Sequence, residues 1–570
     1  MVKAVKLAAP RSAAPEIPAI GVYATSDHRI DKASRARCAF LPGHIAGTLA
    51  SRVKTPQGGS ARVVYSEILV DNEVAADAVA RQFKDAGVGA IVCAPDSWSF
   101  PQLTSMSLLA HFPKDIPFNV TCGNSGPRPG VVYAHALTGA LAQTGRLTHL
   151  NVGTWPDTGP TPEMTPATAD ALVDWCQAAL AHAGLKGRRV AVFGHDSMGM
   201  ETALAHVLAT RRTFGLEITR FDMKHLADLL VKKAYDAQEL KALRAWIDQR
   251  VGKRLVLPTK ADSERFNQSL AMYLIVRDAM KALNAVGGGF MSQLEWGSDP
   301  KLVPLPVADV MESLFNSTFD HNGPKAPLPY ATESDMQALL TMLYFAWLSG
   351  GQAPLFMDFR KVWEPWEIKK LADSLGIPYS SGDAWAERGF FDGNNSGSAS
   401  FDWAGKPGAR PDALMANVRM PLADPGYFPG GGNSVTFRSP GGIKGLAGRM
   451  AFSDLNQMFS LIWDEAETLE LPDALAAKAA SLTDPNWPHT FVSPKYGSMA
   501  EFKQYAPANH IHMVRELPPA RLQYWMDMAG VLSVTPWAAR PSHIPGVDRP
   551  APLIHLINGG EAAAKRLLRP

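Results

Sequence analysis

The sequence predicts an α/β protein in which two Rossmann-like α/β domains precede a mostly β C-terminal domain. Three observations support this fold class. The chain has 570 residues, which is too many for a single hydrophobic core. Apolar, β-rich runs alternate with helical patterns through the first half, and short β-like runs among frequent Gly, Pro and Trp follow in the last third. We expect a flexible tail at 1–16, α/β domains at 17–163 and 164–345, and the β-rich domain at 346–570.

The first α/β domain is expected to contain a parallel sheet, because its strand and helix patterns alternate at the spacing of βαβ units. The expected strands are 20–24, 61–70, 89–94, 118–121 and 148–152. The expected helices are 37–53, 73–86 and 130–143. Residues 153–167 (GTWPDTGPTPEMTPA) are rich in Pro, Gly and Thr and form the expected linker.

The second domain repeats this alternation. Its expected helices are 168–183, 200–210, about 225–250 and 262–286, and its expected strands are 188–194 and 216–221. The third region is expected to open with a helix at 334–349 and a strand at 353–357, followed by short strands such as 434–437 and 490–492.

Charge and cysteine content exclude several classes of protein. The net charge of +2 creates no field that would draw the chain to nucleic acid or an anionic membrane, so we expect neither partner. No apolar stretch reaches the 18 residues that span a bilayer, and residues 1–16 lack the apolar segment of a signal peptide. The four cysteines have no CxxC spacing, which argues against a disulfide framework or a zinc knuckle. We therefore expect a cytoplasmic protein.

Glu333 and Asp358 are the two carboxylates whose positions in the sequence suit a metal-binding or ligand-binding role. Glu333 lies at the start of an expected helix, beside Thr332 and Asp335, which have the spacing of a capping box. It can either interact with the helix dipole or remain ionised as a metal ligand. Asp358 follows the apolar run 353–357, at the carboxyl end of an expected strand, where open α/β sheets bind ligands. The alternative for Asp358 is an ion pair with Arg360.

His510 and His512 are two residues apart and would face the same side of a strand. From spacing alone, a pair of structural histidines is the more frequent arrangement. A Glu, an Asp and a His together would suit a borderline divalent ion such as Mn²⁺. Local spacing cannot bring 333, 358 and 510 together.

Short stretches along nearly the whole chain carry a resemblance to a known family. They are 128–133 (RPGVVY), 197–199 (SMG), 222–223 (DM), 316–323 (NSTFDHNG), 331–333 (ATE), 395–399 (NSGSA), 427–432 (YFPGGG), 486–488 (NWP) and 508–510 (ANH). In this order, they resemble the L-fucose isomerase family of ketol isomerases.

The resemblance implies two N-terminal α/β domains, a β-rich C-terminal domain and a homohexamer. It also implies one Mn²⁺ per subunit, held by residues that correspond to Glu333, Asp358 and His510. The substrate contacts that it implies are Arg29, Trp98, Gln293, Ser398, Trp487 and Asn509. Arg29 falls in a loop that reaches a neighbouring subunit's site in the family.

Asn433 is a departure from the family pattern, because members have an aromatic residue after the triple glycine. An amide there offers hydrogen bonds in place of an apolar surface. We therefore expect Asn433 to contact the sugar and to move substrate preference away from L-fucose.

The function expected from these residues is Mn²⁺-dependent isomerisation of L-fucose, D-arabinose or a related aldose to a ketose, through an enediolate. The metal would polarise the carbonyl. Glu333 and Asp358 would be the catalytic groups, one removing the proton next to the carbonyl and the other moving a proton between oxygens. Two alternatives remain: a non-catalytic sugar-binding or sensor protein, and a glycosidase that uses the carboxylate pair without a metal.

Overall fold

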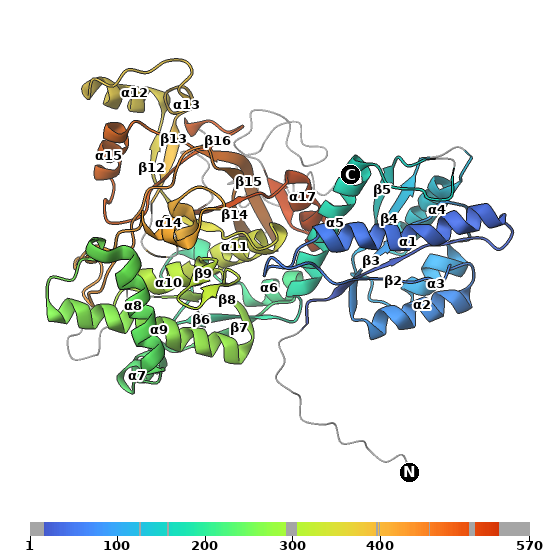
Figure 1. The fold of residues 1–570 in the computed structure, drawn as a ribbon, viewed down its shortest axis with the longest axis horizontal. Coiled ribbons are helices and arrows are strands. Elements are labelled where there is room, and N and C mark those ends of the chain that lie inside the picture. The colour runs from blue at the N-terminus through green and yellow to red at the C-terminus, as the bar shows by residue number, and fades with distance from the viewer. Residues whose placement is uncertain are drawn as a thin grey trace, which may run out of the picture.

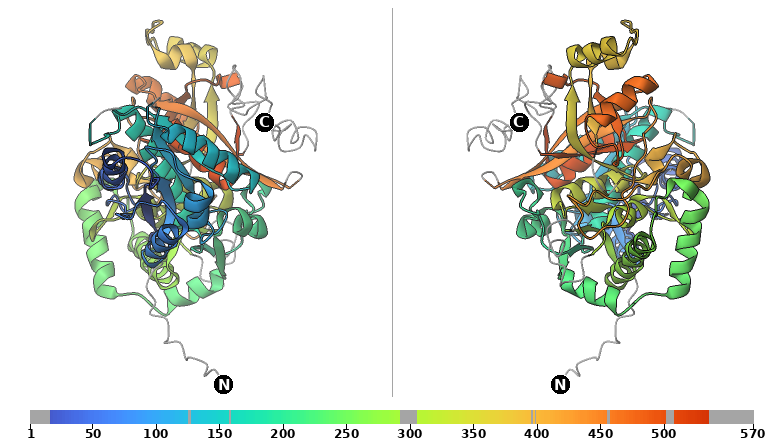
Figure 2. Two further views of the ribbon diagram at one scale, coloured as in Figure 1. Left: turned by 90° about the vertical axis from the view of Figure 1, so that its right-hand side faces the viewer. Right: turned by 90° about the vertical axis from the view of Figure 1, so that its left-hand side faces the viewer.

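The structure is a computed structural model that describes most of the chain. The described residues are 16–124, 127–156, 159–291, 305–394, 397, 399–454, 457–500 and 508–534. Figure 1 shows the N-terminal domain on the right and the rest of the described chain on the left. In the side views of Figure 2, the N-terminal domain lies in front of the other parts in one view and behind them in the other, so the two bodies lie in line along the long axis.

The first domain is built on a five-stranded parallel sheet with the order β2-β1-β3-β4-β5. This confirms the predicted βαβ organisation. The strands are β1 (Ala19–Tyr23), β2 (Val63–Tyr65), β3 (Val88–Cys93), β4 (Phe118–Gly123) and β5 (His149–Gly153). The helices are α1 (Lys32–Arg52), α2 (Glu73–Asp85), α3 (Ser107–Leu109), which follows a π-helical turn at Gln102–Met106, and α4 (Gly130–Gln143).

Helix α5 (Pro166–Leu185) lies between the first domain and the rest of the chain. It packs on β1, β3 and β5 of the first sheet, and also on α11 and α17. Leu172 and Trp175 join the core of the first domain, while Ala181 and Leu185 join the core around α11. The helix expected at the start of the second domain therefore covers the first sheet as well.

The second domain holds a four-stranded parallel sheet with the order β11-β8-β6-β7. Its strands are β6 (Arg189–Phe193), β7 (Glu217–Phe221), β8 (Ala285–Phe290) and β11 (Tyr330–Thr332), with the small hairpin of β9 (Phe319–Asp320) and β10 (Gly323–Pro324) before β11. Its helices are α6 (Val207–Phe214), α7 (Met223–Val231), α8 (Ala237–Val251), α9 (Lys260–Leu283), α10 (Asp309–Asn316) and α11 (Met336–Leu348), with 3-10 turns at Glu201–Ala203 and Gly252–Arg254.

Three expectations about the second domain were wrong. The helix expected over 225–250 is two helices, because the chain turns at Lys233, which has a positive φ. The helix expected at 200–210 begins only at Val207. The end of the expected helix 262–286 is already strand β8: α9 stops at Asn284 in the left-handed region, and the glycines of β8 are closely packed between neighbouring strands and α11.

The third region is a closed antiparallel barrel. Its strands follow the order β14-β17-β12-β13-β16-β15, β15 pairs again with β14, and β18 adds to β15 in parallel. The strands are β12 (Leu355–Trp363), β13 (Phe390–Gly393), β14 (Lys444–Ser453), β15 (Met458–Thr468), β16 (Thr490–Pro494), β17 (His510–Arg515) and β18 (Leu532–Val534). The surrounding helices are α12 (Pro365–Ser374), α13 (Ala384–Arg388), α14 (Pro411–Met415), α15 (Asp473–Ser481) and α17 (Pro519–Ala529), with a 3-10 turn at Phe401–Ala404. The β-rich C-terminal domain is therefore confirmed.

Helix α11 joins the second sheet to the barrel. Every residue from Met336 to Leu348 is buried, and the helix packs on β8 and β11 on one side and on β12, β14 and β17 on the other. Its N-terminus therefore opens where the parallel sheet meets the barrel. No helix in the described part of the chain is both long and apolar enough to cross a lipid bilayer.

Candidate active site

Asp358 and His510 come from neighbouring barrel strands. The antiparallel register of β12 and β17 sets these two residues directly opposite each other, and residues so paired project to the same face of a sheet. Asp358 is thus the fourth residue of a nine-residue strand. The expectation that it ends a strand was wrong, because the strand continues through Phe359 to pair with β13.

His510 and His512 do face the same side of β17, as their spacing predicted. Both rings pack on Phe356, at centroid distances of 4.5 and 5.0 Å. Their polar surroundings differ, since neither ring nitrogen of His512 has a hydrogen-bond partner among the described residues. His510, by contrast, contacts the carboxylates of Asp335, Glu333 and Asp358 directly.

Glu333 belongs to the second domain, and its side chain extends to His510. It follows β11 directly, and both Glu333 and Ser334 adopt positive φ, of 57° and 50°. Such left-handed backbone is rare and strained for residues other than glycine, and it clusters at functional sites. Gly289 of β8 leaves room for this turn, since a Cβ there would come within 3.1 Å of the Ser334 Cα.

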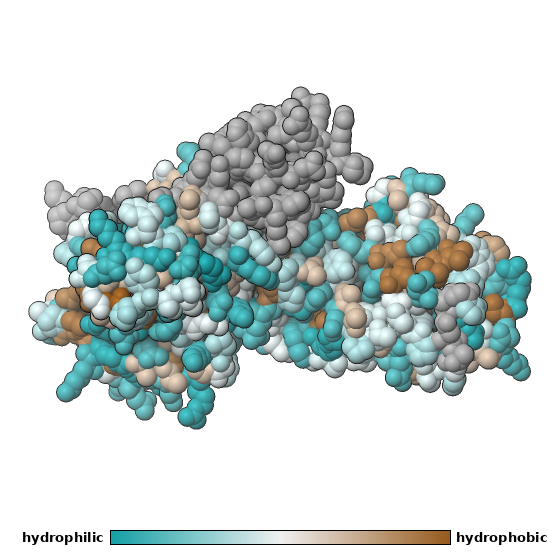
Figure 3. Space-filling model, turned by 90° about the horizontal axis from the view of Figure 1, so that it is seen from above, coloured by the Kyte–Doolittle hydropathy of each residue, from teal (hydrophilic) through white to brown (hydrophobic). Residues whose placement is uncertain are grey.

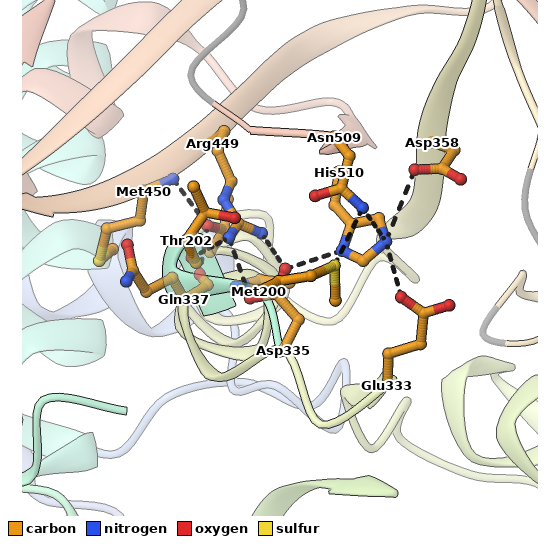
Figure 4. Close-up of polar contacts among 12 residues, drawn as sticks. Met200, Thr202, Glu333, Asp335, Gln337, Asp358, Arg449, Met450, Asn509 and His510 are labelled. Carbon is orange, nitrogen blue, oxygen red and sulfur yellow. Dashed lines mark hydrogen bonds and ion pairs between the residues drawn. The ribbon is translucent and has the colours of Figure 1, made fainter. Parts of the chain in front are cut away.

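The carboxylates of Glu333 and Asp358 converge on one nitrogen atom of His510. The His510 Nε2 lies 3.5 Å from a Glu333 carboxylate oxygen and 3.6 Å from an Asp358 carboxylate oxygen, as Figure 4 shows. The imidazole is fully buried, whereas the side chains of Glu333 and Asp358 are 13% and 19% exposed. A small polar molecule can therefore reach the carboxylates but not the far side of the imidazole.

Asp335 is a member of this site that we did not predict. It is the N-cap of α11, where its side chain accepts a hydrogen bond from the Ala338 amide. The predicted capping box with Thr332 as the cap is therefore wrong by one turn. The other ring nitrogen of His510, Nδ1, lies 2.7 Å from Asp335 Oδ2. The sequence signal was an acidic residue two positions after Glu333, which we interpreted as a helix cap alone.

The pKa shifts in this cluster follow from burial and crowding of charge. Burial by itself would lower the pKa of His510, but hydrogen bonds and charge from the surrounding carboxylates outweigh it and raise this pKa to about 10. Burial raises the pKa of Asp358, and the nearby Glu333 adds to that rise. Burial would also raise the pKa of Asp335, yet the Arg449 guanidinium and His510 hold it well below its usual value.

The donor set fits a divalent ion in kind. Two carboxylates and one imidazole are ligands that Mn²⁺ accepts, and two carboxylates facing one imidazole nitrogen call for a positive charge between them. Donor atoms about 2.1 Å from one ion lie about 3–3.5 Å from each other, close to the observed spacing. In the described residues, however, no group of three or more His, Cys, Asp or Glu side chains has the geometry of a metal site. The Asn509 side-chain amide lies 3.0 Å from His510 Nε2, the atom that would bind the metal.

Two predicted substrate contacts lie beside this cluster. Asn509 is exposed and contacts both His510 and Met200. Trp487 is buried, and the Arg360 guanidinium lies 4.9 Å from its ring centroid. Arg360 is also 3.9 Å from Asp358, which is a weak ion pair at most. Arg360 therefore lies between Asp358 and the Trp487 ring, and its ion pair with Asp358 is weak.

Arg29 and Trp98 lie together in the first domain. Arg29 follows β1 and Trp98 follows β3, and the order of the sheet reverses between these two strands, which is where open α/β sheets bind ligands. Arg29 forms an ion pair with Asp27 and lies 5.0 Å from the Phe100 ring centroid, while Trp98 packs edge-on against Phe100. These partners belong to the first domain, so the structure does not bring Arg29 or Trp98 into contact with the His510 cluster of the same chain.

Asn433 does not have the environment we expected. It is fully buried, and its amide nitrogen donates to the backbone carbonyls of Val256 and Met420. This side chain joins two loops, and its contacts give no support to a role in sugar binding. Two further predicted contacts, Gln293 and Ser398, lie outside the described residues.

Fold and site together define a multidomain α/β enzyme with a carboxylate–imidazole centre between a parallel sheet and a barrel. Family models match the chain in two parts: the first N-terminal domain of L-fucose isomerase at residues 17–187, and the second N-terminal domain at residues 190–350. The chain belongs to the L-fucose isomerase family, and it is an enzyme of the aldose–ketose isomerase class.

Similar proteins extend the match into the barrel. The L-fucose isomerases of Streptococcus pneumoniae (strain 70585) and Vibrio vulnificus (strain YJ016) are each 25% identical to this chain, over 85% of it and 86% of their own length. The L-fucose isomerase of Salmonella typhi is 26% identical over 84% of this chain and 85% of its own. This relationship favours an isomerase over the sensor and the glycosidase that the residues alone left open.

Proposed function

We propose that this protein is a Mn²⁺-dependent isomerase that converts L-fucose, D-arabinose or a related aldose to the corresponding ketose. The observation that carries the proposal is the convergence of Glu333 and Asp358 on His510 Nε2, at 3.5 and 3.6 Å, from two different domains. The names of the relatives support L-fucose as the first substrate to test.

Glu333, Asp358 and His510 would hold the metal, which supplies a Lewis acid that polarises the sugar carbonyl. One of the two carboxylates removes the proton from the carbon next to the carbonyl, and the other transfers a proton between the two oxygens of the resulting enediolate. Both carboxylates retain an exposed edge through which a sugar can approach. Trp487 and Asn509 would contact the bound sugar beside them.

We further propose a homohexamer in which Arg29 and Trp98 complete the site of a neighbouring subunit. An exposed apolar surface on the first domain supports contact between subunits. Figure 3 shows apolar residues gathered on the upper face of this domain. Leu147, Leu150 and Val152 are 37–52% exposed, at the edge of its sheet, and exposed apolar groups in such numbers mark contact surfaces.

The cytoplasm is the compartment that we propose. Cys38, Cys93, Cys122 and Cys176 are all buried, free thiols. A protein that holds four unpaired cysteines suits a reducing environment.

Metal removal and a panel of aldoses test the proposed reaction. The purified full-length chain is dialysed against EDTA and assayed for ketose formation from L-fucose, D-arabinose and related aldoses, with and without added Mn²⁺. We expect no activity without metal and full recovery with Mn²⁺. Full activity in the stripped protein would contradict the metal-dependent mechanism.

Mixed oligomers test whether subunits share sites. Asp358→Asn chains are expected to be nearly inactive alone, and Trp98→Ala chains to have a kcat/KM lowered about 10–200-fold. Mixing the two after mild dissociation should raise kcat/KM above that of either variant, because some sites then contain an intact Trp98 from one chain and an intact Asp358 from another. Light scattering at the assay concentration should report a hexamer. A fully active monomer, or no recovery on mixing, would contradict the shared site.

A further inference from the structure

Both oxygens of the Asp335 carboxylate have two polar partners each. Its Oδ2 contacts His510 Nδ1 at 2.7 Å and accepts from Arg449 at 2.7 Å. Its Oδ1 accepts from Arg449 at 2.9 Å and from the Ala338 amide at 2.8 Å. Both Asp335 and Arg449 are almost completely buried. A carboxylate with four such partners is ionised and cannot turn.

The groups that contact Asp335 come from α11 and from two barrel strands, and Figure 4 shows Arg449 and His510 among them. Ala338 belongs to α11 and Arg449 belongs to β14 of the barrel. Arg449 also donates to the carbonyl of Thr202, which precedes α6. The position of the carboxylate is therefore set jointly by the second domain and the barrel.

The position of Asp335 determines which nitrogen of His510 carries its proton. An ionised carboxylate can only accept, so Nδ1 must donate to it. To act as a metal ligand, His510 must also lose the proton that its raised pKa favours on Nε2. The neutral ring, with its proton kept on Nδ1, then presents an unprotonated Nε2. The Asn509 amide nitrogen, 3.0 Å from Nε2, is at hydrogen-bond distance for a donor to that lone pair, whereas the carboxylate oxygens of Glu333 and Asp358 are too far away for good hydrogen bonds to it.

We propose that Asp335, clamped by Arg449, is a positioning residue that holds His510 as the Nδ1–H tautomer with Nε2 directed at Glu333 and Asp358. This inference rests on the proposed metal-dependent function. A carboxylate behind a metal-ligating histidine fixes the ring and makes it a better ligand. Asp335 touches neither sugar nor metal in this role and acts only through His510.

The variant Asp335→Asn tests the role with little change of shape. Asn caps a helix about as well as Asp, so α11 should keep its N-terminus. An amide NH₂ turned toward Nδ1 would force the proton onto Nε2 and block that nitrogen as a ligand. We expect the dissociation constant for Mn²⁺, measured by electron paramagnetic resonance on the full chain, to rise about 10–100-fold. The ¹⁴N coupling of a coordinated imidazole, visible in spin-echo modulation of wild type, should weaken or disappear.

Asp174→Asn is the matched control, because Asp174 accepts two hydrogen bonds from Arg521 far from this cluster. It should lower the thermal midpoint without changing the Mn²⁺ dissociation constant or the ¹⁴N coupling. If Asp335→Asn behaves like this control, with loss of stability alone, the positioning role is overturned.

Arg449→Lys provides a second test if Asp335→Asn does not fold. It keeps the positive charge but loses the fork that holds both carboxylate oxygens, so the Mn²⁺ dissociation constant should rise by less than in Asp335→Asn. An unchanged constant would overturn the role of the clamp. Wild type that isomerises sugars without binding Mn²⁺ would overturn the proposed function and this inference together, whereas tight binding in all variants would overturn this inference alone.

Discussion

Two polar regions of the molecule differ in burial: the His510 cluster, and the Arg29 region of the first domain, formed by Asp27, Arg29, Trp98 and Phe100. In the cluster, charged groups from two domains are buried together, and their charges shift one another's pKa. In the Arg29 region, Arg29 is 58% exposed, and its partner Asp27 pairs only with Arg29 and the exposed His28 among the described residues. Burial strengthens electrostatic interactions and permits proton chemistry, while an exposed cation beside aromatic rings suits binding. We therefore expect chemistry at the His510 cluster and recognition at the Arg29 region.

The largest expected effect comes from removing the charge of Asp358. Asn keeps the shape and one oxygen of Asp but can neither carry a negative charge nor accept a proton at neutral pH. We expect Asp358→Asn to lower turnover about 10²–10⁴-fold, with weaker Mn²⁺ binding and a nearly unchanged thermal midpoint.

Glu465→Gln is the control for this change, because Glu465 is a barrel carboxylate that pairs with the surface residue Lys495. It should leave turnover intact. If Asp358 serves only Arg360, its substitution should cost about 0–1 kcal/mol of stability and leave turnover close to wild type, which would remove Asp358 from the site.

A smaller effect is expected in the Arg29 region. Trp98→Ala should lower kcat/KM about 10–200-fold through lost contact with the sugar, without changing the affinity for Mn²⁺. Trp366→Ala is the matched control, since Trp366 is 61% exposed on α12. Steady-state kinetics and metal titration on the same preparations separate the two sites. If Trp98→Ala weakens Mn²⁺ binding as well, the division between chemistry and recognition is wrong.

Substitution of Asn433 tests whether this residue affects sugar preference or only the stability of the fold. Because its amide joins Val256 and Met420 inside the protein, Asn433→Tyr should overpack the interior and lower the free energy of unfolding by about 1–3 kcal/mol. We expect the ratio of kcat/KM for L-fucose to that for D-arabinose to stay constant. A changed ratio with unchanged stability would restore the prediction that this residue selects the sugar.

The smallest effect concerns a buried histidine without the carboxylate shell of His510. Burial lowers the pKa of His182 in α5 to about 3, and its Nδ1 has no hydrogen-bond partner among the described residues. Below about pH 6.5, His182 is protonated in the unfolded chain but stays neutral in the folded chain. The free energy of unfolding therefore falls as the pH falls from 6.5 toward 3. This histidine should remove about 1 kcal/mol between pH 6.5 and 5.5.

His182→Gln should flatten the pH dependence of unfolding over that range, measured in denaturant. The exposed His135 offers the control, and His135→Gln should leave the slope as in wild type. An unchanged slope in His182→Gln would show that the buried ring is protonated in the folded protein.

Much of the fold could be predicted because its signals are local. The alternation around β1, β3 and β4 and the helix 130–143 agreed with the structure to within a residue or two. The errors arose where long-range packing outweighed local pattern, as in β8, whose glycines follow an uninterrupted helical pattern but pack tightly between strands. Two barrel strands, β14 and β15, were missed because they are long and apolar in a region whose frequent Gly and Pro predicted only short β-like runs.

The sequence by itself determined the kinds of group available for chemistry: two carboxylates and a histidine without a nearby thiol, and an aromatic and cationic pair in the first domain. Only the tertiary structure decided that Asp358 and His510 face each other, because antiparallel register is set by pairing between distant segments. It also decided that Glu333 turns toward them through a left-handed backbone, and that Asp335 and Arg449 stand behind His510. Such contacts join residues far apart in the chain, and no periodicity or spacing encodes them.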